Sequence, residues 1–467
     1  MRKKMKISIS KIKNSLLSTA LLLSFAVTSC KKYVDIDRPP SSLTPEEAFS
    51  DSATATSAVL GIYAGMASSR ETGGSNAVNY LTTIYGAMSA DEGYFLTNTT
   101  FDLFKDNKLA AGSDLITYWS GLYTRIGRAN YVIERLPGTT NISGRLKNQL
   151  MGEAKFLRAW FYFQLVNYFG DVPLILNTRA LENGLLPRTA SATVYQQIVA
   201  DLTEAKELLT TTYPSIERAR INKNVTSAFL ARVYFYLQNW QAAETEATAV
   251  ISSGTYSLVS NLDNVFLNNS NETIWQISLV ATTTPATIFG DQFIPASTTP
   301  TFVLYDTLAN SFEANDQRKL KWAKAITYSG KTYYYPYKYK LRNATAGNEY
   351  PILLRLSEMY LIRSEALAQQ ENLTGARRDL DSVRKRAGLL PTTAIAKADL
   401  LKALAHERWV ELFVESGDRW FNLKRLKQAT ETLSPIKPSW QPFQQLYPIP
   451  QSAMTANPNL KDNEGYF

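Results

Sequence analysis

Two residue types that often carry out chemistry occur once each in the 467-residue chain, as Cys30 and His406. One histidine and one cysteine exclude a multi-histidine metal site, a cysteine-rich zinc site and an internal disulfide bond. A serine–histidine–aspartate triad would need His406, which lies in the helical pattern of residues 403–412. Packing of this histidine on a helix surface explains it more simply. Catalysis by a pair of Asp or Glu carboxylates stays an alternative, although no spacing in the sequence singles out such a pair. We predict no catalytic site, no metal site and no cofactor.

Cys30 ends a segment typical of a secretory leader. Residues 2–13 hold six Lys or Arg and no Asp or Glu, residues 15–27 are mostly apolar, and Thr28-Ser29 precede the cysteine. The apolar run is too short for a permanent membrane-spanning helix. The pattern resembles a bacterial lipoprotein lipobox, in which the cysteine becomes the lipidated N-terminus, so we predict a signal peptide over 1–29 and acyl chains on Cys30. The alternative is an ordinary signal followed by an incidental buried cysteine.

Most of the excess of basic over acidic residues lies in this leader. The whole sequence has 50 Lys+Arg against 41 Asp+Glu. Without the six basic residues of the leader, 44 remain against the same 41 from residue 30 onward. A nucleic-acid-binding protein needs a stronger positive field, so we predict no nucleic-acid partner.

Most of the chain has the periodicity of helices. Apolar residues recur at helical spacing in several stretches, and the pairs at 225–252 and 351–387 have the size of tetratricopeptide repeats. The expected helical stretches are Asp114–Phe169 as one block, Ala192–Leu209, Val225–Leu237, Gln241–Ser252, Pro351–Gln369, Thr374–Ala387 and Lys397–Glu415. Thr273–Ile277 alternates as a strand does. The predicted fold is therefore mostly α, a tetratricopeptide-like helical repeat scaffold with loop-rich insertions and a few short strands.

Two insertions, at about 68–107 and 256–350, interrupt this scaffold. Both are rich in Gly, Thr, Ser, Asn and aromatic residues, and long loops of this kind in a compact chain usually carry function.

Several motifs follow one another along nearly the whole chain. They are Cys30 with its leader, Trp119-Ser-Gly-Leu-Tyr123, Glu153-Ala-Lys-Phe-Leu-Arg158, Tyr168-Phe-Gly-Asp-Val-Pro173, Asn315-Asp316-Gln-Arg318, Leu354-Arg355-Leu-Ser-Glu358, Glu407-Arg408-Trp409-Val-Glu411, Gly417-Asp418-Arg419-Trp420 and Tyr447-Pro-Ile-Pro450. Together and in this order they resemble the SusD/RagB family of bacterial outer-membrane nutrient-binding lipoproteins. The charged residues of these motifs recur at helical spacing, so we expect them to pair with one another as scaffold rather than catalyse.

The resemblance implies a function. Such a protein binds an oligosaccharide or polysaccharide nutrient at the cell surface without altering it. It passes the nutrient to a TonB-dependent transporter of the SusC type. It would be lipid-anchored in the outer membrane and face outward. The near alternative is a RagB-like protein that takes oligopeptides, and the far alternatives are a glycan-processing enzyme and a purely structural repeat scaffold.

Under this resemblance the chain divides into a signal peptide at 1–29, a tether at 30–43, an N-terminal helical region at 44–255, a ligand-binding insertion at 256–350 and a C-terminal helical region at 351–467. Residues 44–467 would form one globular unit.

Glycan recognition needs flat aromatic faces against the sugar rings and planar hydrogen-bonding groups beside them. The aromatic-rich insertions supply both. We predict that the ligand contacts Tyr94, Phe95, Asn98, Phe101, Phe289, Phe293, Tyr305, Trp322 and Tyr333.

Overall fold

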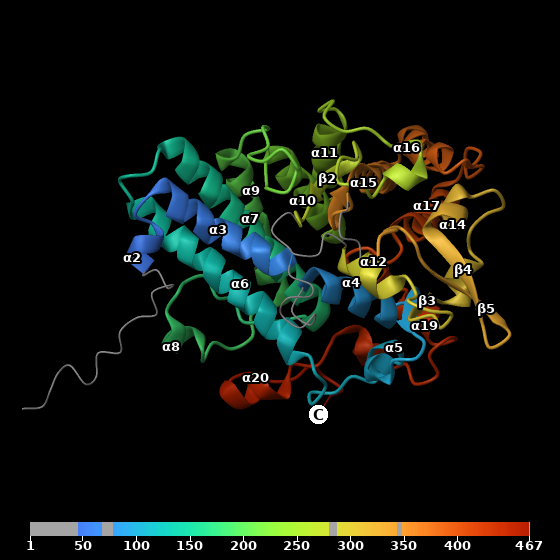
Figure 1. Cartoon of the computed structure of the whole chain (residues 1–467), viewed down its shortest axis with the longest axis horizontal. Coiled ribbons are helices and arrows are strands. Elements are labelled where there is room, and N and C mark those ends of the chain that lie inside the picture. The colour runs from blue at the N-terminus through green and yellow to red at the C-terminus, as the bar shows by residue number, and fades with distance from the viewer. Residues whose placement is uncertain (1–44, 68–77, 280–286, 343–347, 467) are drawn as a thin grey trace, which may run out of the picture. The chain divides into compact units, whose positions relative to one another are not determined.

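The computed structural model describes residues 45–67, 78–279, 287–342 and 348–466. Its contacts divide the chain into residues 1–48, of which only α2 (Pro45–Ala48) is described, and a compact unit of residues 49–467. The described part of this unit is mainly helical, with three two-stranded antiparallel sheets (Figure 1). The predicted mostly helical fold is confirmed. Cys30 and its leader lie outside the described residues. None of the described helices is long and apolar enough to cross a membrane.

The helices pack against their sequence neighbours in one continuous series. Contacts link each of the following to the next: α6 (Ile116–Arg135), α7 (Gly144–Phe169), α9 (Ser191–Leu208), α10 (Lys223–Tyr236), α11 (Trp240–Ile251), α15 (Leu356–Gln369), α16 (Leu373–Arg386) and α17 (Lys397–Leu412). The pairs α10–α11 and α15–α16 are antiparallel hairpins that also pack on each other through α11 and α15. Helix pairs stacked in this way bury a continuous core, as in tetratricopeptide repeats.

Two of the expected helical stretches are not continuous helices, and the one expected to reach Glu415 ends at Leu412. The block predicted over 114–169 is broken after α6 by a 3₁₀ turn (Leu136–Gly138) containing Pro137, and α7 begins anew after Ser143. Ser143 Oγ caps this second helix by accepting from the Leu146 N–H at 3.4 Å. The stretch predicted as helix from Pro351 begins instead with strand β6 (Ile352–Arg355), which pairs with β2 (Thr273–Gln276). The strand expected at 273–277 is confirmed.

The centre of the unit is aromatic. Trp160 of α7 lies 4.8 Å from Phe229 of α10 and 4.9 Å from Trp275 of β2, measured between ring centroids, and the two tryptophan rings meet edge to face. All three side chains are buried. Edge-to-face contacts of this kind add roughly 0.5–1.5 kcal/mol beyond the burial of area, so they hold β2 between the two helices.

A helix that the sequence did not predict, α4 (Val78–Ser89), lies within the insertion expected to be loop-rich. All twelve of its residues are buried. A helix buried on every side has no polar face, so its sequence lacks the alternation of apolar and polar residues by which an amphipathic helix is recognised. Gly86 of α4 lies against Gly417, because a Cβ added at Gly86 would be 2.5 Å from the Gly417 Cα. Glycine at this position is what permits the close approach of the two segments.

The last thirty residues return to the N-terminal part of the unit. The hydroxyl of Tyr447 lies 2.7 Å from Ser89 Oγ at the end of α4. Asn463 Nδ2 donates to the carbonyl of Phe169, the last residue of α7, at 3.0 Å. The chain end therefore completes the packing of helices made far earlier in the sequence.

Lys437 also contacts the end of α4 and makes the stability of the fold dependent on pH. Its buried Nζ donates to the carbonyls of Met88 and Ser89 at 2.6 and 2.7 Å. Burial lowers the pKa of Lys437 to about 7, against about 10.4 in an unfolded chain. Between about pH 7 and pH 10 the unfolded chain binds more protons, so the free energy of unfolding rises with pH over this window and falls as the pH drops through it.

We therefore expect the midpoint of urea unfolding to be higher at pH 9 than at pH 7. Lys437→Met should reduce this rise. Burial also lowers the pKa of Lys424 to about 7, so Lys424 accounts for part of the pH dependence that remains in this variant. Lys427→Met, at an exposed lysine, is the matched control and should leave the rise unchanged. Equal pH dependence in the wild type and the Lys437 variant would contradict the assignment.

Candidate ligand-binding site

Three segments far apart in the sequence meet where the two insertions pack together. Strand β1 (Gly93–Phe95) pairs antiparallel with β3 (Phe302–Leu304), with Tyr94 opposite Val303. A Cβ at Gly93 would lie 2.4 Å from the Phe302 ring, so this position requires glycine. The hairpin of β4 (Ala323–Tyr328) and β5 (Lys331–Pro336) packs on β3 through β5. Loops that the sequence places in separate insertions thus share one site.

Three of the predicted ligand contacts gather there, and we call Tyr94, Tyr305 and Tyr333 the tyrosine cluster. The Tyr94 and Tyr305 rings are 4.9 Å apart between centroids and inclined at 50°. Lys331 Nζ lies 4.9 Å from the centroid of the Tyr333 ring and 2.8 Å from Asp306 Oδ2. All three tyrosines are partly exposed. Their rings are therefore fixed by the strands and still accessible from solvent.

The phenol groups of Tyr94 and Tyr305 are uncharged at neutral pH. Burial raises the pKa of Tyr94, and the nearby Tyr333 and Asp306 raise it further, although Lys331 opposes this effect. Burial also raises the pKa of Tyr305, with Tyr94 adding to the shift. Both phenols therefore stay protonated and can donate hydrogen bonds. The site offers ring faces, hydroxyl donors and an ammonium group, which together suit a sugar.

A layer of phenylalanines lies beneath the tyrosine cluster and is closed to solvent. Phe95, Phe289 and Phe293 are each at most 5% exposed. Phe95 stacks on Phe101 at 4.6 Å, and Phe293 lies 4.8 Å from Phe302. Other rings cover the surfaces of these three residues in this structure, and their predicted contact with the ligand stays a prediction. They support the cluster by packing under its strands.

Asn98 and Phe101 lie at the edge of the same region. Asn98 is exposed, and its Oδ1 accepts from the Thr100 N–H at 3.1 Å, which caps a short 3₁₀ turn (Thr99–Phe101). Phe101 is partly exposed beside Phe95. Both remain available to a ligand, so their predicted role stays a proposal.

Trp322 is a core residue in this structure, and its predicted contact with the ligand stays a prediction. Its relative exposure is 0%, and its Nε1 donates to the Leu262 carbonyl at 3.0 Å. Three cations surround its ring: Lys338 Nζ at 5.1 Å, Arg386 Cζ at 5.3 Å and Arg355 Cζ at 5.6 Å, measured to the ring centroid. A ring enclosed in this way has no face left for a sugar.

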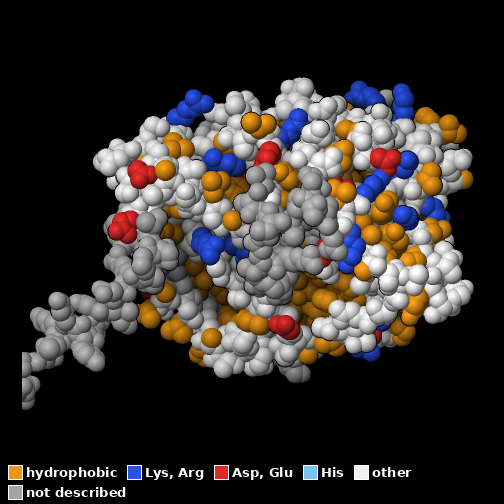
Figure 2. All heavy atoms as spheres, viewed as in Figure 1, with side chains coloured by type: hydrophobic (Ala, Val, Ile, Leu, Met, Phe, Trp, Pro, Cys, Tyr) orange, Lys and Arg blue, Asp and Glu red, His pale blue; other side chains and the backbone are white. Residues whose placement is uncertain are grey.

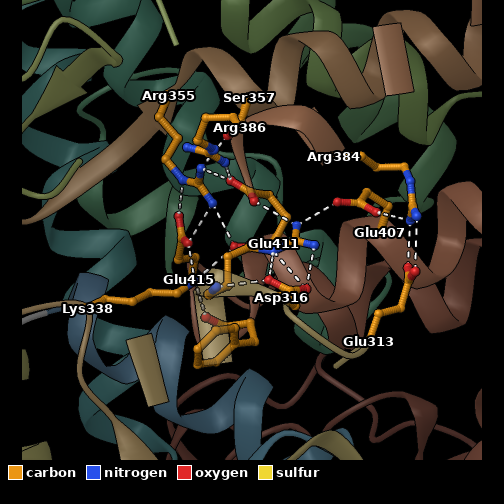
Figure 3. A network of polar contacts seen from close by, with 12 residues as sticks. Glu313, Asp316, Lys338, Arg355, Ser357, Arg384, Arg386, Glu407, Glu411 and Glu415 are labelled. Carbon is orange, nitrogen blue, oxygen red and sulfur yellow. Dashed lines mark hydrogen bonds and ion pairs between the residues drawn. The ribbon is translucent and has the colours of Figure 1, made fainter. Parts of the chain in front are cut away.

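Those cations belong to a buried network of arginines and carboxylates (Figure 3). Glu411 of α17 is at its centre: its Oε2 accepts from Arg318 Nη1 at 3.0 Å, and its Oε1 from Arg355 and Arg386. Burial alone would raise the pKa of Glu411, but the guanidinium groups of Arg386, Arg355 and Arg318 lower it well below its usual value. The remaining acids of the network are Glu272, Asp316, Glu407 and Glu415.

The network holds the base of the β4–β5 hairpin. Trp322, the residue before β4, is enclosed by its cations. Lys338, two residues after β5, donates from Nζ to the carbonyls of Glu411 at 3.0 Å and Phe413 at 2.8 Å and pairs with Glu415. Both ends of the hairpin are therefore fixed to α17 and the residues after it, which positions Tyr333.

The other charged motifs are paired as expected, although across elements and not along one helix. Arg158 makes two hydrogen bonds to Asp201, at 2.8 and 2.6 Å. Arg220 pairs with Glu153, and Arg419 with Asp91. His406 Nε2 lies 2.9 Å from the Ser311 carbonyl, as a packed histidine would. Within the described ranges no group of three or more His, Cys, Asp or Glu is arranged to hold a metal ion.

Sequence reasoning missed the charged residues around the tyrosine cluster. Lys331 and Asp306 reach it only because the β4–β5 hairpin folds onto β3. A signal for that hairpin existed: Ser329 and Gly330 form its two-residue turn, both with positive φ, of 49° and 78°. A two-residue turn with glycine between alternating stretches is a hairpin signature.

Comparisons with known proteins agree with this fold over nearly the whole chain. Residues 33–235 match the family profile described as "Starch-binding associating with outer membrane", and residues 229–466 match the profile of the SusD family. Two SusD-like proteins of Formosa agariphila are 24% and 26% identical to the chain. Each alignment covers 96% of this chain, and 98% and 99% of the respective relative.

Solved structures share the fold. A SusD superfamily protein from Bacteroides vulgatus has a TM-score of 0.79 at 20% identity, over 89% of this chain and 99% of its own. A laminarin-binding SusD-like protein has a TM-score of 0.76 at 22% identity, over 90% of this chain and 100% of its own. The profile over residues 229–466 covers half of the sequence, and the chain belongs to the SusD family.

Proposed function

We propose that this protein binds oligosaccharides or polysaccharides at the cell surface and delivers them, unaltered, to a TonB-dependent transporter of the SusC type. The observation that carries the proposal is the tyrosine cluster: Tyr94, Tyr305 and Tyr333 converge from three distant segments, partly exposed, with a lysine and hydroxyl donors beside the rings. Flat rings next to hydrogen-bond donors are what a sugar face requires.

The relatives support the same reading. One profile carries the description of starch binding in association with the outer membrane, and one protein of similar fold is named for laminarin binding. The location follows from the predicted lipidation of Cys30, which would anchor the chain in the outer membrane facing outward. Among the buried carboxylates of the described scaffold, Glu153, Glu407 and Glu411 pair with arginines, which supports a structural role for these three groups.

Calorimetry of the full chain in detergent against a panel of neutral oligosaccharides tests the proposal. We expect saturable binding to one glycan class. Tyr94→Ala together with Tyr333→Ala should weaken binding about 30- to 800-fold, because each covered ring contributes roughly 1–2 kcal/mol. Tyr360→Ala, which removes a partly exposed tyrosine on α15, is the control and should leave the affinity unchanged.

Three outcomes would count against the proposal. Appearance of shortened sugars by chromatography would indicate an enzyme. Binding to peptide digests alone would indicate peptide uptake. Wild-type affinity in the double tyrosine variant would move the site away from the tyrosine cluster.

A further inference from the structure

A groove lies at the base of the β4–β5 hairpin, beside α14 (Gln317–Trp322). It has a volume of about 850 Å³. Tyr334, which follows Tyr333 in β5, lines it. We call it the lysine groove after the side chains that line it, among them Lys319, Lys321, Lys324, Lys340, Tyr334 and Tyr337. Its volume is in the range of sites that bind small molecules.

Two of its lysines already have a carboxylate partner. Lys321 Nζ lies 2.7 Å from Asp263 Oδ2, and Lys340 pairs with the other oxygen of the same carboxylate. Hydrogen bonds from both lysines lower the pKa of Asp263, so it is ionised at neutral pH. One carboxylate therefore pairs with two ammonium groups, which leaves a net positive charge on this side of the groove.

The other two lysines have no carboxylate within ion-pair distance among the residues that the structure describes. Lys319 Nζ lies 5.4 Å from the centroid of the Tyr334 ring, and Lys324 Nζ lies 4.8 Å from that of Tyr337. Attraction to a ring face does not neutralise an ammonium group, so both charges remain available.

The other acids along the groove cannot supply the missing charge. Glu313 accepts two hydrogen bonds from Arg384, at 2.6 and 3.0 Å. Asp316 is buried and held by Arg318 at 2.8 Å. Figure 2 shows Lys and Arg side chains beside hydrophobic ones on the right of the molecule, the side on which Figure 1 labels α14 and β4.

From this arrangement we propose that the lysine groove is a second binding site that takes an anionic sugar unit, with a carboxylate or sulfate group on Lys319 and Lys324 and a ring face against Tyr334 or Tyr337. Leu320, which is 71% exposed at the groove, adds apolar surface. The saccharide class of the ligand rests on the proposed function, whereas the preference for negative charge rests on the lysines alone. A charged polymer that occupies both the lysine groove and the tyrosine cluster would gain affinity from both sites.

Matched pairs of oligosaccharides that differ only in charge test the proposal on the full chain in detergent. One pair is oligogalacturonate and its methyl ester, and the other is κ-carrageenan oligosaccharides before and after desulfation. We expect the acidic member of at least one pair to bind about tenfold more tightly than its neutral partner, since one charge-assisted contact is worth about a factor of ten. Which pair responds identifies the anionic group as carboxylate or sulfate. The preference should weaken as salt is added.

Lys319→Gln with Lys324→Gln should abolish this preference and leave the affinity for the neutral members unchanged. Lys427→Gln with Lys461→Gln removes the same charge at exposed lysines that do not line the groove, and should preserve the preference. The Tyr94 and Tyr333 double variant should weaken neutral binding but keep the preference for charge.

These readouts separate the two proposals. Acidic members that bind no more tightly than their neutral partners, or a preference that survives in the double lysine variant, would overturn the anionic site. Loss of neutral binding without loss of the charge preference would leave the anionic site standing. A charge preference without any neutral binding in the wild type would remove the tyrosine cluster as a glycan site and support the lysine groove alone.

Discussion

Glu411→Gln is expected to lower the free energy of unfolding by about 3–5 kcal/mol, the range found when one partner of a buried ion pair is removed. The substitution keeps the shape of the side chain and removes only its charge. Glu411 is 0% exposed and accepts from three guanidinium groups, those of Arg318, Arg355 and Arg386. Without the carboxylate, three buried cations share fewer anions. The shift in the urea midpoint of the full chain, multiplied by the slope, measures this cost.

The matched control is Glu182→Gln. Glu182 Oε2 pairs with Arg179 at 3.1 Å, but both side chains are more than half exposed. Removal of an exposed ion pair typically changes stability by less than about 1 kcal/mol. A Glu411 variant as stable as this control would show that the buried network is not what holds α17 to the hairpin.

Trp322→Ala should cost a similar amount, about 3–5 kcal/mol, for a different reason. Removal of the fully buried indole leaves a cavity that the neighbouring side chains cannot fill. A loss of about 3–5 kcal/mol is the usual range when a large buried aromatic side chain is replaced by alanine. The Leu262 carbonyl also loses the donor that now lies 3.0 Å away. Urea unfolding again gives the magnitude.

Leu181→Ala is the large-to-small control, because Leu181 is 92% exposed and its loss should change stability by less than about 0.5 kcal/mol. Trp322→Phe retains most of the buried ring area and should cost less than Trp322→Ala. If the alanine variant were as stable as the wild type but bound glycan more weakly, Trp322 would be a ligand contact after all and its burial here would not describe the binding state.

The helices of the scaffold could be predicted from the sequence because apolar residues recur in them at helical spacing, and glycine or proline marks the end of some of them. Gly170, with φ of +72°, ends α7 where glycine and proline indicated a stop. Helix α4 could not be found in this way, since burial on every side removes the period. Strand β6 was predicted as part of the following helix, because its apolar residues continue into those of α15 without a break.

The candidate site was predictable in kind but not in detail. Aromatic residues in the insertions indicated a binding surface, and Tyr94, Tyr305 and Tyr333 do meet. The sequence could not separate them from Phe95 or Trp322, because exposure depends on which neighbour covers each ring. Tyrosine, with a hydroxyl that needs a partner, remained partly exposed at this edge, whereas the phenylalanines packed inward.

Pairing of the charged motifs was predictable, but the partners were not. Glu407, Glu411 and Glu415 recur every fourth residue, which indicates one face of a helix. Their arginine partners come from α14, β6 and α16, and only the packing of these elements brings them together.

The contact between Ser89 and Tyr447 also sets an order of events in folding. It joins residues 358 positions apart, so the intervening chain must be ordered before the contact can repay the loss of loop entropy. While the chain is being synthesised, the end of α4 lacks both Tyr447 and Lys437. The N-terminal helices consequently reach their final packing only after the last residues have emerged.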